Sequence, residues 1–386
     1  MSRETIAHIN LNALSHNLER VRAMAPGKRV MAVVKADAYG HGLHRVAQAL
    51  TAADLFAVAT FSEAQVLRRH GLAHPILLLE GFHCVGDLPL ILQQNLELVV
   101  HNDEQLQVLE QFDWQQHAGL SLRRAWLKLD TGMHRLGFAP ERSHEVYQRL
   151  QAIAAIQEVA LMSHFACADA SDHPLNAEQI RRFDAAVVGI DAQQSFANSA
   201  ALVNFPVAHR DWVRSGIMLY GVSPTAEHSA ASLGLRPALT LNTRLLAVHQ
   251  VSAGESLGYG ADFVCPEDMP VGIAAIGYGD GYPRHAKNGT PILVNGQQAS
   301  LAGRVSMDMI AIDLRHVSKA EVGDTVTLWG DGLPIETVAA HADAIPYQLL
   351  CGITSRVEYR LSEADNAPDE ALANAAHSNT FKVANP

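Results

Sequence analysis

The chain has 386 residues, more than one hydrophobic core usually supports, so its length predicts a large domain followed by a smaller one. Hydrophobic residues make up 48% and charged residues 18% of the chain, a composition that excludes a disordered protein. The formal net charge of -11, with no basic run, excludes a nucleic-acid-binding protein.

The cysteines and the N-terminal segment bear on location. Cys84, Cys167, Cys265 and Cys351 lie far apart without a CxxC pair, so we predict neither a disulfide framework nor a metal site. The first residues, MSRETIAHINLNALSHNLERV, lack the apolar core of a signal peptide, and no later apolar run approaches the roughly 20 residues that cross a bilayer. We therefore expect a cytoplasmic protein without a membrane partner.

From about residue 29 to residue 217, short apolar or β-branched runs alternate with longer amphipathic stretches, as in βα units. We predict strands at residues 30–35, 55–60, 76–80, 96–100, 122–130, 159–164, 194–198 and 209–214. The segments FSEAQVLRRHG, NDEQLQVLEQF and PERSHEVYQRLQAI between them have helical spacing, and each opens with a capping Ser or Asn, or with a Pro. Eight such units favour a (β/α)8 TIM-type barrel over an open sheet.

After GLRPALT the pattern changes to β-branched runs broken by Gly and Pro. We therefore place a boundary near Leu235, with the barrel over residues 1–234 and a mostly antiparallel β domain over residues 235–362. Asn295–Gly296 predicts a hairpin turn in this domain. The polar, Ala-rich residues 363–386 are expected to form a disordered tail.

Basic side chains lie where predicted barrel strands end, the end that carries the active site in barrel enzymes. They are Lys35, Lys128, His164 and Arg214. Lys35 closes the apolar run AVVK, where its ammonium must be desolvated unless its charge is removed, as Schiff-base formation does. A lysine that reaches solvent or pairs with Asp37 is the structural alternative.

Polar residues also follow the last two predicted strands. The run Asn198-Ser199-Ala200 follows the seventh strand, and the run Ser215-Gly216-Ile217 follows the eighth. Hydroxyls and backbone N–H groups at these places commonly bind phosphate in barrels, so they predict a phosphorylated cofactor. For each segment taken alone, a helix cap or a glycine-dependent turn is the alternative.

The chain resembles the alanine racemase family in nine segments that occur in the family's order. They are VVKADAYGHG, LKLDTGMHRLGF, SHFA, NSAA, VRSGIMLYG, LGYGADF, IGYGDGYPR, GRVSMDM and IPYQ, within residues 6 to about 357. The resemblance implies a homodimeric, pyridoxal 5'-phosphate-dependent isomerase that interconverts L-alanine and D-alanine and supplies D-alanine for peptidoglycan. Three positions depart from the family pattern: His134, Ser215 and Ser306.

The resemblance also implies the cofactor's ligands. Lys35 corresponds to the lysine that binds the cofactor aldehyde, and Tyr39 to a phosphate ligand, although a tyrosine taken alone would be a packed aromatic. Arg214 corresponds to the arginine at the pyridine nitrogen. A guanidinium cannot give up a proton to that nitrogen, which favours reprotonation over transamination. The whole set is Lys35, Tyr39, His164, Asn198, Ser199, Arg214, Gly216, Ile217 and Tyr347.

Further barrel residues are implied to support the substrate. Arg135 resembles the arginine that contacts the substrate carboxylate and the cofactor's phenolic oxygen. Lys128 resembles a lysine that is often carbamylated and orients this arginine; an ordinary salt bridge to Asp130 is the alternative. His164 resembles a residue that ties Arg214 to the catalytic tyrosine, but alone it would be taken for a satisfied core histidine.

The β domain is implied to supply the rest of the site. Tyr259 lies between glycines in LGYGADF and resembles the second catalytic base, which the partner subunit contributes in this family. Met307 and Asp308 resemble residues of a partner segment that lines the substrate carboxylate site, and Tyr278 is a supporting residue. Without the family, SMD would be an ordinary strand end.

Racemisation requires that the α-proton leave one face and return on the other, which two opposed bases achieve. By resemblance, Lys35 serves D-alanine and Tyr259 serves L-alanine, and we expect a cationic environment around them. The alternatives are a broader-specificity racemase, a related barrel-type decarboxylase and a non-catalytic cofactor carrier. The missing signal peptide opposes the first, Arg214 opposes the second, and the β domain opposes the third.

Overall fold

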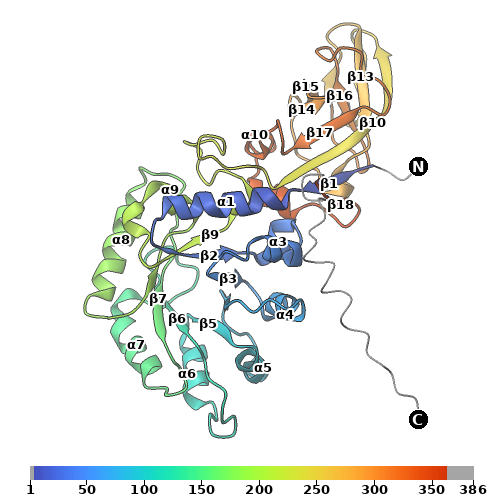
Figure 1. Cartoon of the computed structure of the whole chain (residues 1–386). Helices are drawn as coiled ribbons and strands as arrows, with labels where there is room; N and C mark the ends of the chain where they lie inside the picture. The colour runs from blue at the N-terminus through green and yellow to red at the C-terminus, as the bar shows by residue number, and fades with distance from the viewer. Residues whose placement is uncertain (1–3, 363–386) are drawn as a thin grey trace, which may run out of the picture.

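Eight parallel strands close into a barrel, and a second, mostly antiparallel sheet lies beside it (Figure 1). The computed structural model describes residues 4–362. Each barrel strand pairs with its neighbours in the chain, and the last pairs with the first. The strands are β2 (Arg29–Val33), β3 (Leu55–Val58), β4 (Ile76–Leu78), β5 (Leu96–Val100), β6 (Ala125–Lys128), β7 (Val159–Met162), β8 (Gln194–Ser195) and β9 (Trp212–Ser215). The predicted (β/α)8 barrel is confirmed.

Helices cover the outside of the barrel (Figure 1). After the strand-connecting turn α2 (Lys35–Gly40), they are α3 (Leu43–Ala49), α4 (Phe61–Arg69), α5 (Leu88–Gln93), α6 (Asp103–Gln111), α7 (Ser143–Gln151), α8 (Pro174–Val187) and α9 (Ser199–Asn204), with α1 (Leu11–Met24) before β2. Asn102 caps α6 as the sequence predicts. The segment FSEAQVLRRHG is capped by Thr60, which precedes it, and not by its own serine, because Thr60 Oγ1 accepts a hydrogen bond from Glu63 N.

The barrel strands are apolar on both faces. LFAV in β3 and LELVV in β5 are buried at every position. Parallel strands have this composition because the barrel interior covers one face and the helices cover the other. In the sequence, these strands are therefore recognised by continuous runs of apolar residues and not by alternation of apolar and polar residues.

The second sheet is built mainly from the last third of the chain. Its strands β10 (Leu239–Val251), β13 (Met269–Ala274), β14 (Pro291–Val294), β15 (Gln297–Leu301), β16 (Ile310–Asp313) and β17 (Thr325–Trp329) pair antiparallel. The β domain also contains a small separate hairpin and two helices. The hairpin is formed by β11 (Ser256–Leu257) and β12 (Phe263–Val264), and the helices are α10 (Ile335–His341) and α11 (Pro346–Cys351). The predicted hairpin turn joins β14 to β15, with φ of 47° at Asn295 and 74° at Gly296.

The first strand, β1 (Ile6–Ile9), belongs to this second sheet. It pairs antiparallel with β10 and parallel with β18 (Glu358–Leu361). This differs from our expectation that residues 1–234 form the barrel domain alone. A four-residue apolar run gives no local sign of which sheet it joins, because its partners are far away in the sequence.

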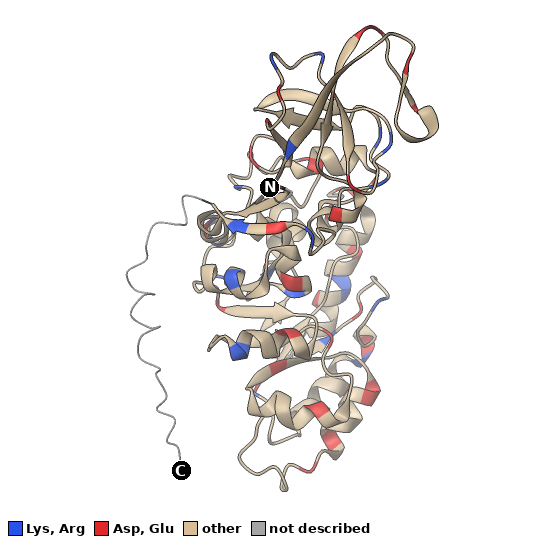
Figure 2. Ribbon diagram, turned by 90° about the vertical axis from the view of Figure 1, so that its right-hand side faces the viewer, with Lys and Arg blue, Asp and Glu red and all other residues tan. Residues whose placement is uncertain are grey.

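Charged residues of both signs are interspersed over both domains in the view of Figure 2. Between residues 4 and 362, no helix combines the length and the apolar character needed to cross a bilayer. The tail that we expected at residues 363–386 lies outside the described residues.

Candidate active site

The parallel register of the barrel brings the basic residues to one end. Lys128 is the last residue of β6 and pairs with Met162 of β7, which in turn pairs with Ser195 of β8. Arg214 lies near the end of β9, and Lys35 follows β2 after one intervening residue. The predicted basic residues therefore meet at the carboxyl ends of the strands.

The backbone after Lys35 has an unusual conformation. Four consecutive non-glycine residues, Ala36 to Tyr39, have φ between 52° and 54° and ψ between 41° and 54°. Left-handed helical geometry costs an L-residue about 1–2 kcal/mol, so this turn requires support from its surroundings. The support includes Asp37 Oδ1, which accepts a hydrogen bond from Leu43 N at 2.7 Å, and the His41 ring, whose Nδ1 is 2.9 Å from the Tyr39 carbonyl oxygen.

Arg214 is buried and extensively hydrogen-bonded. Nη1 donates to Ser195 Oγ at 2.7 Å, and Nη2 donates to the carbonyl oxygens of Ser163 and Phe196 at 2.6 and 3.1 Å. Burial, and secondarily the charge of Arg135, lowers the pKa of Arg214 to about 10, so the guanidinium remains charged at neutral pH. These contacts fix its orientation in the barrel mouth.

His164 lies against this guanidinium. Arg214 Nη2 is 3.1 Å from His164 Nδ1, and because arginine only donates, Nδ1 must accept and the neutral ring carries its proton on Nε2. Burial, followed by the charges of Arg214 and Lys128, holds the pKa of His164 well below its usual value. His164 therefore offers an N–H donor on the side away from Arg214.

Lys128 belongs to a cationic cluster. Burial, and then the charges of Arg214, Arg135 and Lys35, lower the pKa of its ammonium to about 8. Its amine is thus partly neutral near physiological pH. A cluster of four cations at a barrel mouth favours anionic ligands, and this is the cationic environment expected around Lys35.

Asp130 does not neutralise this cluster through an ion pair. Oδ1 accepts hydrogen bonds from the backbone N–H groups of Gly132, Met133 and His134 at 2.9–3.1 Å, and Oδ2 lies 3.1 Å from His134 Nδ1. Within residues 4–362, no ion pair joins it to Lys128. Asp130 instead shapes the loop that carries Arg135, whose side chain is exposed.

Tyr39, Ser199 and Gly216 form a close polar cluster beside Arg214. Ser199 Oγ accepts a hydrogen bond from Gly216 N at 2.9 Å. A Cβ atom at Gly216 would lie only 2.5 Å from Tyr39 Oη, so this approach requires glycine. Burial, followed by the charges of Tyr347 and Cys351, raises the pKa of Tyr39, whose hydroxyl therefore stays protonated and can donate to an anion.

The neighbouring residues complete this cluster, which we call the cradle. Asn198 caps α9 by accepting from Ala201 N at 2.9 Å, and Ile217 is fully buried at the start of η4 (Ile217–Tyr220). The ring of Tyr347, on α11, lies 5.7 Å from that of Tyr39. Burial, and then the charge of Asp169, raises the pKa of Tyr347 to about 12. Its hydroxyl is a second protonated donor near the cradle.

Tyr259 is presented by a tight loop in the β domain. It opens the turn η5 (Tyr259–Ala261) between β11 and β12, and Gly258 and Gly260 have φ of 69° and 76°. Arg304 pairs with Asp262 beside this turn. The Tyr259 side chain is 70% exposed, so its own chain does not cover it.

The remaining β-domain residues lie in two segments joined by backbone hydrogen bonds. Tyr278 N, at the start of η6 (Tyr278–Asp280), donates to Ser306 O at 3.0 Å, and Gly279 N donates to Met307 O at 2.9 Å. Asp308 Oδ1 accepts from Arg356 Nη2 at 2.6 Å. The side chains of Met307 and Tyr278 are 53% and 41% exposed.

The predicted site residues therefore form two groups in one chain. The group at the barrel mouth contains the basic cluster and the cradle, to which α11 of the β domain contributes Tyr347, and the second group contains Tyr259, Tyr278, Met307 and Asp308. Within residues 4–362, no hydrogen bond joins Tyr259 or Met307 to a barrel residue.

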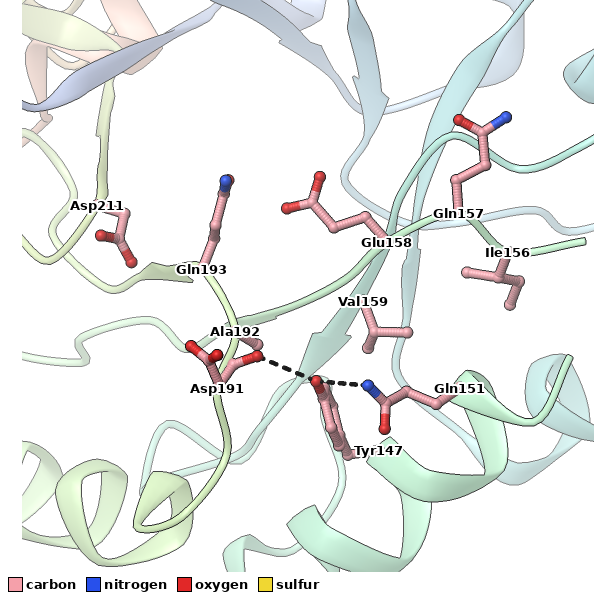
Figure 3. Close-up of a pocket in the computed structure, with 10 residues that line it drawn as sticks. All are labelled: Tyr147, Gln151, Ile156, Gln157, Glu158, Val159, Asp191, Ala192, Gln193 and Asp211. Carbon is pink, nitrogen blue, oxygen red and sulfur yellow. Dashed lines mark hydrogen bonds between the residues drawn. The ribbon is translucent and has the colours of Figure 1, made fainter. Parts of the chain in front are cut away.

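Neither of two concave regions of the protein coincides with this site. One, of about 680 Å³, lies at the opposite end of the barrel, where Glu158, Gln193 and Asp211 precede their strands (Figure 3). There Tyr147 Oη donates to Asp191 O at 3.3 Å and accepts from Gln151 Nε2 at 2.8 Å. The other, of about 260 Å³, is lined by Tyr220, Trp329 and apolar residues where the two domains meet. The chemistry of the basic cluster, and not the size of a hollow, identifies the candidate site.

Several residues that support the cluster were not predicted from the sequence. Ser195 binds Arg214, and the Tyr220 ring packs 4.7 Å from that of Tyr39 while its hydroxyl donates to Val33 O. The available signal for Ser195 was a small polar residue directly before the apolar residues Phe196 and Ala197 in a predicted strand. Tyr220 gave none, since a tyrosine after a strand is common in cores.

Family models match nearly the whole described chain. The model described as alanine racemase, N-terminal domain, matches residues 9–224, and the model for the alanine racemase C-terminal domain matches residues 238–361. The alanine racemase of Nitrosococcus oceani is 52% identical over 352 residues, covering 91% of this chain and 97% of that protein. The alanine racemase of Vibrio cholerae is 48% identical over 353 residues, covering 91% and 96%.

Solved structures are similar over the same extent. The biosynthetic alanine racemase from Pseudomonas aeruginosa superposes with a TM-score of 0.88 at 45% identity, covering 94% of this chain and all of that one. The alanine racemase from Acinetobacter baumannii gives the same TM-score at 37% identity, covering 93% and 100%.

Proposed function

This chain belongs to the alanine racemase family, and we propose that it catalyses the family's reaction at its barrel mouth with pyridoxal phosphate, using Lys35 and Tyr259 as the two bases. The enzyme is an isomerase that interconverts L-alanine and D-alanine. The observation that carries the assignment of residues is the convergence of Lys35, Lys128, His164 and Arg214 at one end of the barrel. No feature of this end favours a decarboxylase, which would have a carboxylate in place of Arg214.

The cradle fits the phosphate of the cofactor. The protonated hydroxyl of Tyr39, the Ser199 hydroxyl and the Gly216 N–H lie together, and a side chain at Gly216 would fill the space beside them. Asn198, Ile217 and Tyr347 border this space. Pyridoxal phosphate, when joined to an amino acid, withdraws electrons from the α-carbon and makes its hydrogen acidic.

Arg214 would face the pyridine nitrogen of the cofactor. Its guanidinium has only donors and stays charged, so it would hold the nitrogen by a hydrogen bond without supplying a proton. His164 supports this arrangement by accepting from Arg214 while its Nε2–H remains free to donate to the catalytic tyrosine. Arg214 would thereby supply positive charge at the ring nitrogen, and His164 would supply an N–H donor that positions the catalytic tyrosine.

The two bases divide the faces of the substrate. Lys35 Nζ would take the α-proton of D-alanine, and Tyr259 Oη would supply a proton on the other face to give L-alanine; in the reverse direction Tyr259 takes the proton of L-alanine and Lys35 supplies one. Tyr259 is exposed and unattached to its own barrel, which supports its donation to the barrel mouth of a second copy. Met307, Asp308 and Tyr278 would accompany it, and the enzyme would be a homodimer with shared sites.

Lys128 and Arg135 would hold the anionic groups. A partly neutral amine on Lys128 can react with CO2, and the resulting carbamate would place a negative charge among Arg135, Arg214 and Lys35. Such a carbamate would orient Arg135 toward the substrate carboxylate. A cytoplasmic location, where D-alanine is needed for peptidoglycan precursors, is part of this proposal and agrees with four free cysteines.

The direct test is spectroscopic and kinetic. The purified enzyme should show a visible absorbance band that borohydride abolishes, and it should form D-alanine from L-alanine. Lys35→Ala should lose both the band and the activity, because the change removes the amine that binds the aldehyde. A variant that retained covalent cofactor would exclude Lys35, and release of CO2 from an amino acid would favour a decarboxylase.

A further inference from the structure

One carboxylate outside the family-derived set contacts the backbone next to Lys35. Glu63, in the first turn of α4, accepts a hydrogen bond at Oε1 from Ala36 N at 2.7 Å. Its other oxygen, Oε2, accepts from Ala59 N and Thr60 N at 2.9 and 3.1 Å. A single side chain thus joins the start of α4 to the start of the left-handed turn.

The Ala36 N–H belongs to the peptide unit that contains the carbonyl group of Lys35. Fixing the plane of this unit fixes the backbone torsion from which the Lys35 side chain extends. The turn is closed by a backbone hydrogen bond from Ala38 N to Val34 O at 2.9 Å, and Glu63 adds a side-chain contact at the peptide unit inside this turn. Glu63 therefore acts where the strand β2 changes into the left-handed turn.

The start of α4, which carries Glu63, is held in place by hydrogen bonds and by the neighbouring barrel strand. Its backbone N–H donates to Thr60 Oγ1 at 3.3 Å, which completes the capping box of α4. The preceding strand β3 pairs with β2, and Val34 N donates to Ala57 O at 2.9 Å. The carboxylate is thus fixed by the neighbouring barrel strand, so its position relative to Lys35 is defined by the barrel itself.

We propose that Glu63 is a positioning residue for Lys35, holding the lysine in the orientation required to bind the cofactor aldehyde and to transfer the proton. The proposal rests on the function assigned to Lys35 above. Glu63 does not touch the reacting groups and acts only through the backbone at Ala36. The competing explanation is that Glu63 merely caps α4 and that its contact with Ala36 has no consequence for the lysine.

Glu63→Gln separates these explanations. A glutamine satisfies a capping box as well as a glutamate does, through one amide oxygen. If that oxygen faces Ala59 and Thr60, the amide nitrogen faces the Ala36 N–H, where two donors oppose each other. The variant should therefore keep the helix cap and lose the link to the turn. Thr60→Ala is the matched control, since it weakens the cap and leaves the Ala36 contact in place.

The experiment follows the return of the visible band when pyridoxal phosphate is added to enzyme stripped of cofactor with hydroxylamine. We expect Glu63→Gln to unfold within a few degrees of the wild type but to regain the band roughly ten- to a hundredfold more slowly, with a similar loss in kcat and little change in KM for alanine. Thr60→Ala should lower the melting temperature and regain the band at the wild-type rate.

Band recovery within twofold of the wild type in Glu63→Gln would overturn the proposal, as would equal slowing in Thr60→Ala. Failure of Glu63→Gln to fold would also count against it, since glutamine should preserve the cap. A wild-type enzyme that neither forms the band nor racemises alanine would instead refute the function assigned to Lys35, which keeps the two failures distinct.

Discussion

Tyr39 and Gly216 approach so closely that a single added methyl group at Gly216 would lie 2.5 Å from the Tyr39 hydroxyl oxygen. Tyr39 cannot easily move away, because it is 7% exposed and packs against Tyr220 and Tyr347. We expect Gly216→Ala to weaken pyridoxal phosphate binding by about tenfold or more, equivalent to about 1.4 kcal/mol. Titration of cofactor-free enzyme measures this. Gly86→Ala, at a glycine whose nearest neighbour lies at 3.6 Å, is the control and should bind normally.

The proposed sharing of sites between subunits can be tested by complementation. Lys35→Ala removes the barrel base and Tyr259→Phe removes the β-domain base, so each homodimer should be nearly inactive. A mixed dimer has one site with both defects and one intact site. We expect mixing to restore activity up to about a quarter of the wild type, because half the dimers are mixed and each has one working site. No recovery after confirmed subunit exchange would contradict a shared site.

Tyr259→Phe tests the division of labour between the bases. The change removes only an exposed hydroxyl, so folding and cofactor binding should be unchanged. Proton abstraction from L-alanine should fall by roughly 10²–10⁴-fold, the contribution of a positioned general base. Lys35 should still exchange the α-proton of D-alanine with deuterated solvent, with retention of configuration. Equal loss of exchange from both isomers, measured by NMR, would refute the assignment.

The lowered pKa of Lys128 predicts that racemase activity depends on CO2 and on pH. Burial lowers the pKa of its amine to about 8, and only the neutral amine forms a carbamate. As the pH falls below 8, protonation should deplete the carbamate and reduce racemisation, and added bicarbonate should partly restore it. Enzyme in ¹³C-bicarbonate should give a carbamate carbon signal that Lys128→Met lacks, while Lys287→Met keeps it. A signal that survives in Lys128→Met would place the carbamate elsewhere.

The burial of His41 predicts that the free energy of unfolding decreases in acid. It is fully buried, its Nε2 has no hydrogen-bond partner, and burial lowers its pKa to about 4. The unfolded chain binds this proton near pH 6.5 and the folded chain only near pH 4, so the free energy of unfolding decreases as the pH falls through this window. The loss from pH 7 to pH 5 should be about 2 kcal/mol. Urea unfolding of His41→Gln, at equal protein concentration, should show a decrease that is smaller by this amount; an unchanged decrease would contradict it.

Much of the barrel could be predicted from the sequence because its strands are short continuous apolar runs. All eight lie within or overlap the predicted ranges, although β8 contains only Gln194–Ser195 where five residues were predicted at 194–198. The difference arises because the buried residues Phe196 and Ala197 continue the apolar pattern beyond the last residue of the strand. The boundary near Leu235 stays a prediction.

The local geometry of the site could not be predicted in the same way. Ala36 to Tyr39 contain no glycine, so nothing in ADAY indicates a left-handed turn. The hydroxyl of Ser195 and the carboxylate of Glu63 reach the site only because neighbouring barrel strands bring them there. The residue types at strand ends predicted the chemistry of the site. The residues that hold those side chains in place could not be predicted, because they are distant in the sequence.

The place of β1 has a consequence for synthesis on the ribosome. This strand leaves the ribosome before the barrel strands, yet it pairs with β10, which follows the barrel, and with β18, the last strand of the described chain. The barrel can complete its ring after β9 has emerged, whereas IAHI waits unpaired until β10 has emerged and gains its second neighbour only with β18. Closure of the second sheet is therefore a late step of folding, and it places the first and the last described strands side by side.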